Sequence, residues 1–211
     1  MTSAAIAAAL SAVLSLPRMW LWENRPSTLW YAEATIFLCG FVLWAFVFAW
    51  HTEYTRRPLF TLKIEPFIFV IATLAGIMAA LGLHLLVDPG LRARHPQDFP
   101  ADFKNWIAST LFTLSFLQLF LMFAPFAWAV RLFRNQKVAT WLTVALIGLV
   151  FALKANTYSP PLPAMILVEL LVLRIVSGFF AVWFYLRGGI FLAWWIALLI
   201  EARYLLTIYG H

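Results

Sequence analysis

The chain alternates between long apolar runs and short polar segments that carry most of its charge. An α-helix needs about 20 predominantly apolar residues to cross the hydrocarbon core of a bilayer. The pattern therefore predicts an all-α, polytopic membrane helix bundle with six transmembrane helices. We expect one integral membrane domain over 1–211, in which 29–209 forms the six-helix bundle. The predicted spans are 29–50, 66–87, 106–130, 138–153, 164–186 and 190–208.

The segment 1–28 precedes the first of these spans. Its apolar run over 3–16 reaches only Pro17 and Arg18, which makes it shorter than a span requires. No basic residue stands ahead of the run, as one would in a secretory signal. We predict a short helix over 4–22 that lies in the membrane interface, with a tilted short span as the alternative.

The composition excludes a soluble domain. The chain is 64% hydrophobic and 11% charged, and its mean hydropathy is +0.88. The net charge of +6 is scattered over several loops. Such charge suits an anionic lipid surface and predicts no nucleic-acid partner. The single cysteine, Cys39, excludes an internal disulfide and a multi-cysteine metal site.

The loops between the spans differ in their basic residues, which sets the expected orientation. Loops 51–63, 131–137 and 187–189 hold seven Lys and Arg residues, and loops 88–105 and 154–163 hold four. Short cytoplasmic loops carry the excess of Lys and Arg in membrane proteins. We therefore place the first three loops in the cytoplasm, and the expected location is the bacterial inner (cytoplasmic) membrane.

The last two predicted spans contain four charged residues, Glu169, Arg174, Glu201 and Arg203. A charge at bilayer depth is costly, so it faces the bundle interior and has a partner. A tight turn at 187–189 would make the two helices antiparallel, and the rise of 1.5 Å per residue then pairs Glu169 with Arg203 and Arg174 with Glu201. These pairs would hold the helices together; the alternative is a polar site for a substrate, an ion or a lipid headgroup.

Other polar residues within the spans are candidates for the same cluster or for ligand binding. Gln118 lies at about the predicted depth of Arg174 and could hydrogen-bond across helices. His51 and His84 are predicted to lie roughly a bilayer apart, so they cannot ligate one metal together. Each remains a candidate single-histidine ligand of a pigment metal, with an interfacial histidine as the plainer interpretation. We predict no metal site and no cofactor, and leave a bound lipid or pigment open.

The segment Gly178-Phe-Phe-Ala-Val-Trp-Phe-Tyr-Leu-Arg-Gly-Gly-Ile-Phe-Leu-Ala193 resembles part of a known family. It is similar to the penultimate segment of the CAAX-protease and bacteriocin-processing (CPBP) intramembrane proteases, which have a Gly, a Tyr, an Arg and Thr-Gly-Ser-Leu before a helix ending in His-x-x-x-Asn. Upstream, 126–132 resembles the family's Glu-Glu-x-x-x-Arg-Gly helix and keeps its arginine as Arg131. Segment 151–155 resembles the family's Phe-x-x-x-His step, so the resemblance covers roughly 106–205.

The residues that the family uses for catalysis are absent from the matching positions. Phe126 and Ala127 stand in place of the two glutamates, Ala155 and Leu198 in place of the two histidines, and Ala202 in place of the asparagine. The family's glutamate activates a water molecule, and an apolar side chain cannot take a proton from water. The resemblance therefore implies a CPBP-like pseudoenzyme, a protease-like helix bundle that has lost catalysis.

The expected function is that of a non-catalytic integral membrane protein. It would act as a scaffold or accessory subunit of a hetero-oligomeric membrane complex, and its partners would be membrane proteins and lipids. One alternative is a divergent intramembrane protease that uses Glu169 or Glu201 as the base. The other alternative is a small-molecule or ion carrier built around the buried Glu and Arg residues.

Overall fold

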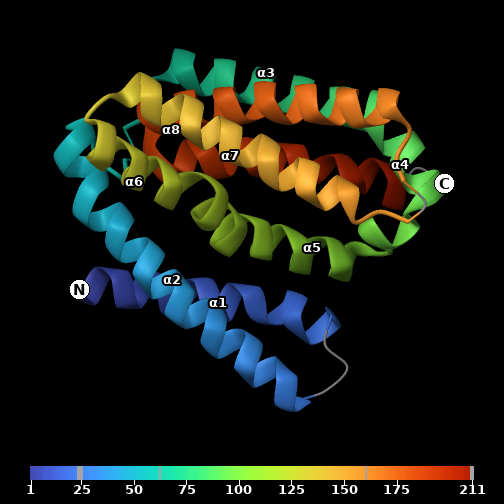
Figure 1. Ribbon diagram of the computed structural model, residues 1–211, viewed down its shortest axis with the longest axis horizontal. Helices are drawn as coiled ribbons and strands as arrows, with labels where there is room; N and C mark the ends of the chain where they lie inside the picture. The colour runs from blue at the N-terminus through green and yellow to red at the C-terminus, as the bar shows by residue number, and fades with distance from the viewer. Residues whose placement is uncertain (23–25, 62, 160, 210–211) are drawn as a thin grey trace. The chain divides into compact units, whose positions relative to one another are not determined.

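Every secondary-structure element in the described part of the chain is helical (Figure 1). The computed structural model describes residues 1–22, 26–61, 63–159 and 161–209. The α-helices are α1 (Thr2–Trp22), α2 (Pro26–Thr55), α3 (Pro66–Gly82), α4 (Asp88–Arg94), α5 (Phe103–Phe112), α6 (Ala124–Phe133), α7 (Gln136–Asn156) and α8 (Ala164–Ile208). Three π-helical turns, η1 (Leu83–Val87), η3 (Thr113–Leu117) and η4 (Leu119–Phe123), and one 3-10 turn, η2 (Pro96–Asp98), join them. The all-α prediction is confirmed.

Among the described residues, six helical stretches are long and apolar enough to cross a membrane. They are Thr2–Leu21, Thr28–Thr55, Pro66–Arg94, Phe103–Phe133, Gln136–Asn156 and Ala164–Ile208. Two of them are composite, because η1 joins α3 to α4 and the turns η3 and η4 join α5 to α6. Each predicted span over 29–208 falls within one of these stretches.

The predicted N-terminal helix over 4–22 is confirmed, and it begins two residues earlier, at Thr2. Helix α1 continues through Pro17 and Arg18 and ends at Trp22. Its apolar stretch therefore has 20 residues, the length that a span requires. This length fits the alternative of a tilted short span, and the choice between that span and an interfacial helix stays a prediction.

Helix α8 is broken at Gly189, as the predicted turn at 187–189 requires. Its 45 residues would measure about 68 Å if straight, more than twice the thickness of a bilayer core. Gly189 has φ 65° and ψ −160°, a backbone conformation that is almost restricted to glycine. Side chains from the two arms share one apolar cluster, with Leu170 on the first arm and Ile200 on the second. The arms therefore run back along each other, as predicted for 164–186 and 190–208.

The chain divides into two compact units, each built from two separate stretches of sequence. The first unit comprises Met1–Leu59 and Asp102–Ala139, and the second comprises Phe60–Ala101 and Thr140–His211. We refer to them as the N-terminal unit and the C-terminal unit. The prediction of one domain over 1–211 stays a prediction.

In the N-terminal unit, α1 and α2 form a hairpin whose core contains Met19, Leu29 and Ile36. Farther along the hairpin, the Trp44 indole donates to Ser11 Oγ at 3.0 Å, and Ser11 Oγ donates to the backbone carbonyl of Ser115 at 3.1 Å. Ser115 lies in η3, where the π-helical turn disturbs the regular hydrogen bonding of the backbone. The serine of α1 thus satisfies a carbonyl at an irregular turn of the neighbouring helix.

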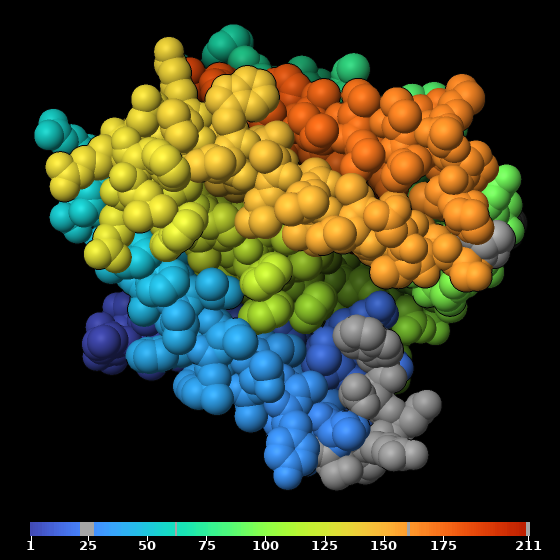
Figure 2. All heavy atoms as spheres, viewed as in Figure 1, coloured from blue at the N-terminus to red at the C-terminus, as the bar shows by residue number. Residues whose placement is uncertain are grey.

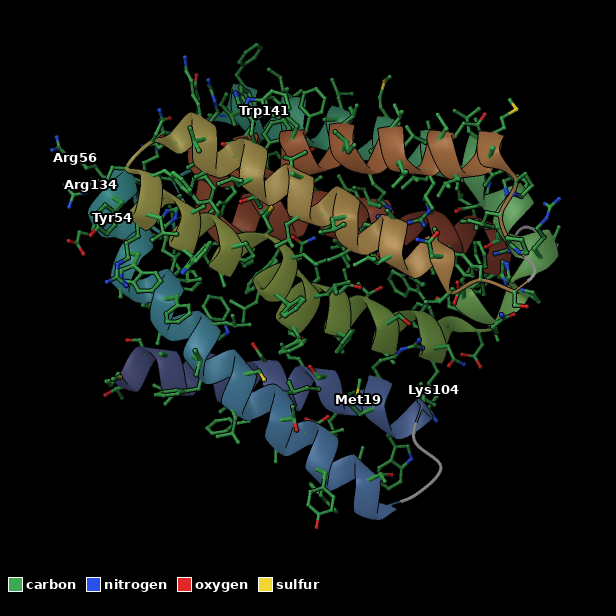
Figure 3. The ribbon with its side chains drawn as sticks, in the orientation of Figure 1. Met19, Tyr54, Arg56, Lys104, Arg134 and Trp141 are labelled. Carbon is green, nitrogen blue, oxygen red and sulfur yellow. The ribbon has the colours of Figure 1, made fainter. Side chains whose placement is uncertain are left out.

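Basic residues mark one end of the N-terminal unit. Figure 3 shows Tyr54, Arg56 and Arg134 together at this end, while Lys104 lies at the opposite end. The Gln136 side chain also donates to the Thr55 carbonyl at 3.4 Å. The parts of loops 51–63 and 131–137 that belong to this unit, 51–59 and 131–137, therefore share one end of it, which is the grouping that their basic residues predicted.

In the C-terminal unit, α3, α7 and both arms of α8 pack side by side (Figure 1). The core between α3 and α8 contains the buried residues Ile68, Ala72, Phe184, Leu192 and Ile196. The Trp195 indole donates to Thr73 Oγ1 at 2.9 Å and adds a polar contact beside this core. At the Gly189 end, Phe60 and Phe191 are in ring contact at 5.7 Å.

The turn η1 decides which way the end of the third span faces. The sequence predicted a span that ends at residue 87 and a loop over 88–105, but the helix continues through Pro89 into α4. The Asp88 N–H bonds to the Leu83 carbonyl, five residues earlier, so the backbone widens directly ahead of the proline. This widening avoids the clash that a proline ring makes with the carbonyl four residues before it. Asp88 is consequently buried within the unit and not exposed in a loop.

Candidate functional site

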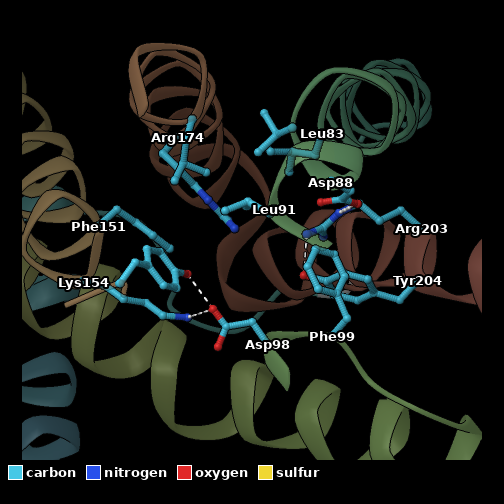
Figure 4. Close-up of a pocket in the computed structure, with 13 residues that line it drawn as sticks. Leu83, Asp88, Leu91, Asp98, Phe99, Phe151, Lys154, Arg174, Arg203 and Tyr204 are labelled. Carbon is cyan, nitrogen blue, oxygen red and sulfur yellow. Dashed lines mark hydrogen bonds and ion pairs between the residues drawn. The ribbon is translucent and has the colours of Figure 1, made fainter. Parts of the chain in front are cut away.

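A cavity of about 60 Å³ lies in the C-terminal unit, at the end opposite Gly189 (Figure 4). Both arms of α8 contribute to it, together with η1, α4, α7 and the segments that follow α4 and α7. Its lining is mixed, with charged, phenolic and apolar side chains. The lining residues are Leu83, Val87, Asp88, Leu91, Asp98, Phe99, Phe151, Lys154, Tyr158, Leu170, Arg174, Arg203 and Tyr204.

The inner wall of the cavity is built on a buried ion pair. Arg203 Nε donates to Asp88 Oδ2 at 3.0 Å, and the two side chains are 3% and 6% exposed. The guanidinium also donates to the Ile200 carbonyl at 2.8 Å and to the Tyr204 hydroxyl. Breaking such a pair strands one charge in the interior, which is strongly destabilising. The pair therefore holds the second arm of α8 against the end of η1.

The rim of the cavity is a second, more exposed polar cluster. Asp98 accepts a hydrogen bond from the Tyr158 hydroxyl at 2.6 Å, and its ion pair with Lys154 measures 3.4 Å. The Tyr158 ring stacks on His95 at 4.3 Å, and His95 is buried although its segment was predicted to be a loop. Burial and, second, the hydrogen bond to Asp98 raise the pKa of the Tyr158 hydroxyl above its usual range. This hydroxyl is therefore a proton donor throughout the physiological range.

Arg174 enters the cavity from the first arm of α8. Its guanidinium lies over the Phe151 ring, 4.2 Å from the ring centroid. Figure 4 shows the side chain reaching from its helix toward the middle of the cavity. Its Nε is buried, and among the described contacts it has neither a hydrogen bond nor an ion pair. The cation–π contact stabilises part of this charge, and the N–H groups of the guanidinium remain available to donate hydrogen bonds.

The predicted pairing of Arg203 with Glu169 is wrong. Arg203 is paired with Asp88 instead, because η1 carries that carboxylate into the interior. Glu169 lies on the first arm of α8 and is half-buried.

The predicted contact between Arg174 and Glu201 is not formed as an ion pair. The two charges interact electrostatically, but the described residues include no ion pair between them within 4 Å. Both residues nevertheless belong to the C-terminal unit, as the antiparallel arrangement of the two arms required.

The remaining predicted residues lie elsewhere. Gln118 is half-buried between η3 and η4 of the N-terminal unit, so it is not a lining residue of this cavity. His51 is fully buried in the same unit, with its ring centroid 6.4 Å from that of Phe126, and its interfacial position stays a prediction. His84 is half-buried in η1 of the C-terminal unit. The described residues contain no group of three or more His, Cys, Asp or Glu side chains that could hold a metal ion.

The positions that resemble the protease motifs are apolar and packed. Phe126 and Ala127 are fully buried in α6, and Arg131 lies over the Trp50 ring at 4.2 Å. Ala155 is also buried, in the C-terminal unit. No protein-family model, curated protein or solved structure matches the chain. The resemblance to the CPBP family therefore stays a prediction.

Sequence reasoning missed most of the polar residues that line the cavity. The residues that were assigned to loops without a role are Asp88, Asp98, Lys154 and Tyr158. A signal for Asp88 was present, because an acid followed directly by proline suits the first turn of a helix as well as the end of one. Nothing in the sequence placed the loops that follow α4 and α7 next to each other.

The arrangement is suited to binding an anion. The charged lining consists of Arg174, Arg203, Lys154, Asp88 and Asp98, so the cations exceed the carboxylates by one. Both carboxylates are already engaged by bases of the protein.

Proposed function

We propose that this chain is a non-catalytic integral membrane protein that acts as an accessory subunit of a membrane complex. The six long apolar stretches support insertion, and so does the surface of the C-terminal unit. In Figure 2, α7 and the first arm of α8, coloured yellow to orange, cover the visible face of this unit. Large apolar side chains are exposed along both helices, namely Trp141, Leu142, Leu149, Leu153, Met165, Val168, Val172, Ile175 and Val176.

Water would disfavour such a surface, whereas lipid tails or a partner helix would cover it. Monomeric soluble proteins rarely expose continuous apolar patches of this kind. The prediction of location in a bacterial inner membrane is retained as part of the proposal. The basic loops 51–63 and 131–137 would then face the cytoplasm.

One observation carries the non-catalytic part of the proposal. The carboxylates that line the cavity are consumed by ion pairs, Asp88 with Arg203 and Asp98 with Lys154. The positions that resemble the protease's glutamates hold Phe126 and Ala127, both fully buried. General-base catalysis needs a base within hydrogen-bond reach of its water. We infer that the protein acts by binding other membrane components, because the carboxylates of its cavity serve to hold helices together and not to activate water.

Native purification tests the accessory role. The tagged chain, extracted in a mild detergent from its own membrane, should co-elute with one or more membrane proteins in fixed stoichiometry. Blue-native electrophoresis and mass spectrometry would identify them. Elution of the chain alone, from digitonin and from lipid nanodiscs alike, would contradict the proposal.

A protease assay tests the absence of catalysis separately. The purified chain should not cleave a panel of membrane-anchored peptides, and Glu201→Gln and Glu169→Gln variants should be indistinguishable from the wild type. Cleavage by the wild type that is lost in Glu201→Gln, with the variant's thermal unfolding unchanged, would favour the divergent protease.

A further inference from the structure

We propose that the cavity beneath Arg174 binds a phosphate-bearing anion. The inference rests on Arg174, a half-buried cation whose Nε is buried without a hydrogen-bond partner among the described residues. It also rests on other donors that face the same space, and on the size and position of that space. It goes beyond the accessory role proposed above, because a scaffold requires no ligand. The phosphate belongs either to a lipid headgroup or to a free anion, and the two sources can be separated by experiment.

Arg174 is the residue whose surroundings point to a bound ligand. Its Nε is buried, and the part of the chain that the structure describes gives its guanidinium no hydrogen bond and no ion pair. Leaving a buried charged group unsatisfied costs more than leaving a neutral one. The Phe151 ring, whose centroid is 4.2 Å from the guanidinium carbon, gives the charge a cation–π contact but supplies no oxygen acceptor for its N–H groups. An oxyanion in the cavity could accept from two of them at once, which is the geometry that favours arginine at phosphate sites.

Further donors line the same cavity. Lys154 lies at the rim with its ammonium 3.4 Å from Asp98, and an ammonium has three N–H groups. The Tyr204 hydroxyl accepts from Arg203, so its own hydrogen remains to be donated. Together with Arg174, these side chains place donors on several sides of the cavity. A phosphate group, with several acceptor oxygens, matches this distribution better than a planar carboxylate does.

Two carboxylates in the lining oppose anion binding, and both are neutralised within the protein. Asp88 is paired with Arg203, and Asp98 is paired with Lys154 and hydrogen-bonded by Tyr158. Glu201 also interacts electrostatically with Arg174 but is not among the lining residues. Arg174 therefore represents the excess positive charge of the lining.

The size and position of the cavity limit what it can hold. A volume of about 60 Å³ accommodates a few water molecules or one small group, and drug-sized ligands need about 300 Å³ or more. Its rim is exposed through Lys154 and Asp98, whose side chains are 52% and 30% exposed. In the proposed membrane placement this rim lies at the end of the spans, at headgroup level, so a lipid could insert its phosphate while its tails stay outside. The lipid source rests on that placement, whereas the free anion does not.

Binding to the purified full-length chain in a neutral detergent tests the proposal. The probes are inorganic phosphate, dihexanoyl phosphatidic acid and the matching diacylglycerol, which lacks the phosphate. Titration of the thermal unfolding midpoint gives an apparent Kd for each probe. Arg174→Met removes the proposed contact, and Arg174→Gln repeats the test if the methionine variant does not fold. Arg187→Met is the matched control, because Arg187 is also an α8 arginine in a cation–π contact, 3.9 Å from the Trp183 ring centroid, but lies beside the break at Gly189 and does not line the cavity.

We expect phosphatidic acid to bind the wild type and Arg187→Met with equal Kd, and to bind Arg174→Met roughly 10- to 100-fold more weakly, as loss of a charge-assisted contact predicts. Tighter binding of phosphatidic acid than of inorganic phosphate would assign the site to a lipid headgroup, and equal binding of the two would assign it to a free anion. The proposal is overturned if Arg174→Met and Arg174→Gln bind as the wild type does, or if diacylglycerol binds as tightly as phosphatidic acid. These results leave the accessory role untouched, because the assay contains no partner subunit.

Discussion

Arg203 and Lys154 each pair with an aspartate in the C-terminal unit, and burial separates the two pairs. The Arg203 and Asp88 side chains are 3% and 6% exposed, whereas those of Lys154 and Asp98 are 52% and 30% exposed. Solvent screens the exposed pair and leaves it with a small net contribution. The buried pair has no such screening, so the loss of one partner strands a charge.

Asp88→Asn should destabilise the protein by about 3–5 kcal/mol, because Arg203 would keep its charge in the interior without a counter-charge. Asp98→Asn should cost at most about 1 kcal/mol. Thermal and denaturant unfolding in detergent would measure both. Equal losses for the two variants would show that burial does not govern these pairs.

The charges of Arg174 and Glu201 offer a second test at the residue scale. They interact electrostatically without an ion pair, so Arg174→Met and Glu201→Gln should be nearly additive, with a coupling free energy below about 0.5 kcal/mol. The corresponding cycle on Asp88 and Arg203 should show a coupling of about 1 kcal/mol or more, since these side chains touch. Strong coupling in the first cycle would restore the direct contact that the sequence had suggested.

Individual backbone positions decide where the helices break and begin. Gly189 divides α8 into two arms, and Asp102 starts α5 by accepting a hydrogen bond from the Asn105 backbone N–H at 2.7 Å. The first position needs a conformation that side chains disfavour, and the second needs an acceptor for an N–H that the helix leaves unpaired.

Gly189→Ala should destabilise the protein by about 1–3 kcal/mol, because a Cβ is strained at φ 65° and ψ −160°. Gly82→Ala is the matched control, since its new Cβ would be 3.7 Å from Leu173 Cδ2, an ordinary contact, and its backbone is helical. The control should be neutral or slightly stabilising, because alanine is the better helix former. Unfolding midpoints in detergent would report both, and an unchanged midpoint for Gly189→Ala would mean that the break tolerates a side chain.

Acid should weaken the start of α5. The backbone hydrogen bond from Asn105 and, second, the side-chain amide of Asn105 lower the pKa of the Asp102 carboxyl. A lowered folded-state pKa adds stability above the unfolded value, about 3.9, and this stability is lost as the pH falls through the lower folded-state pKa. Hydrogen exchange of the first turn of α5 should therefore speed up below about pH 4 in the wild type. Asp102→Asn, which caps without ionising, should abolish that dependence; an identical pH profile in the variant would assign the effect to another group.

Across the whole molecule, loops that were predicted to lie on the same side of the membrane meet within each unit, the cytoplasmic ones in the N-terminal unit and the outer ones in the C-terminal unit. In the N-terminal unit these are the ends of 51–63 and 131–137, which Gln136 and Thr55 connect. In the C-terminal unit, segments 88–101 and 154–159 meet at the cavity rim through Asp98 and Lys154. Loops that the sequence placed on one side of the membrane thus lie together within each unit.

Cysteine labelling in intact cells tests the absolute orientation. Cys39 is exposed and is first replaced by alanine, and single cysteines are then introduced as Glu53→Cys and Gln97→Cys, both at exposed positions. Thr55, in the same loop as Glu53, is unsuitable as a labelling site because its side chain is buried. An impermeant maleimide should label Gln97→Cys only, since loop 88–105 is expected on the outer side. Labelling of Glu53→Cys alone would reverse the topology, and permeabilised cells, in which both should react, provide the control.

The sequence alone determined the helical class, the approximate spans over 29–208, the break at 187–189 and the grouping of the loops. These are local properties, because they depend on the length of apolar runs, on a glycine at the turn and on the count of basic residues in each loop. The sequence also placed Glu201, Arg174 and Arg203 in one part of the molecule, since antiparallel arms fix depth through the rise per residue.

Tertiary structure decided which residues face one another. A π-helical turn such as η1 adds one residue to a turn of helix and so rotates everything after it by about 100°. That rotation carries Asp88 to Arg203. Arg174 has no ion pair within the described residues, although sequence spacing had assigned each arginine a glutamate. The cavity rim also depends on tertiary structure, because it joins two loops that are far apart in the chain. Depth follows from counting residues along one helix, whereas facing depends on backbone irregularities and on the packing of neighbouring helices, and these exist only in the folded molecule.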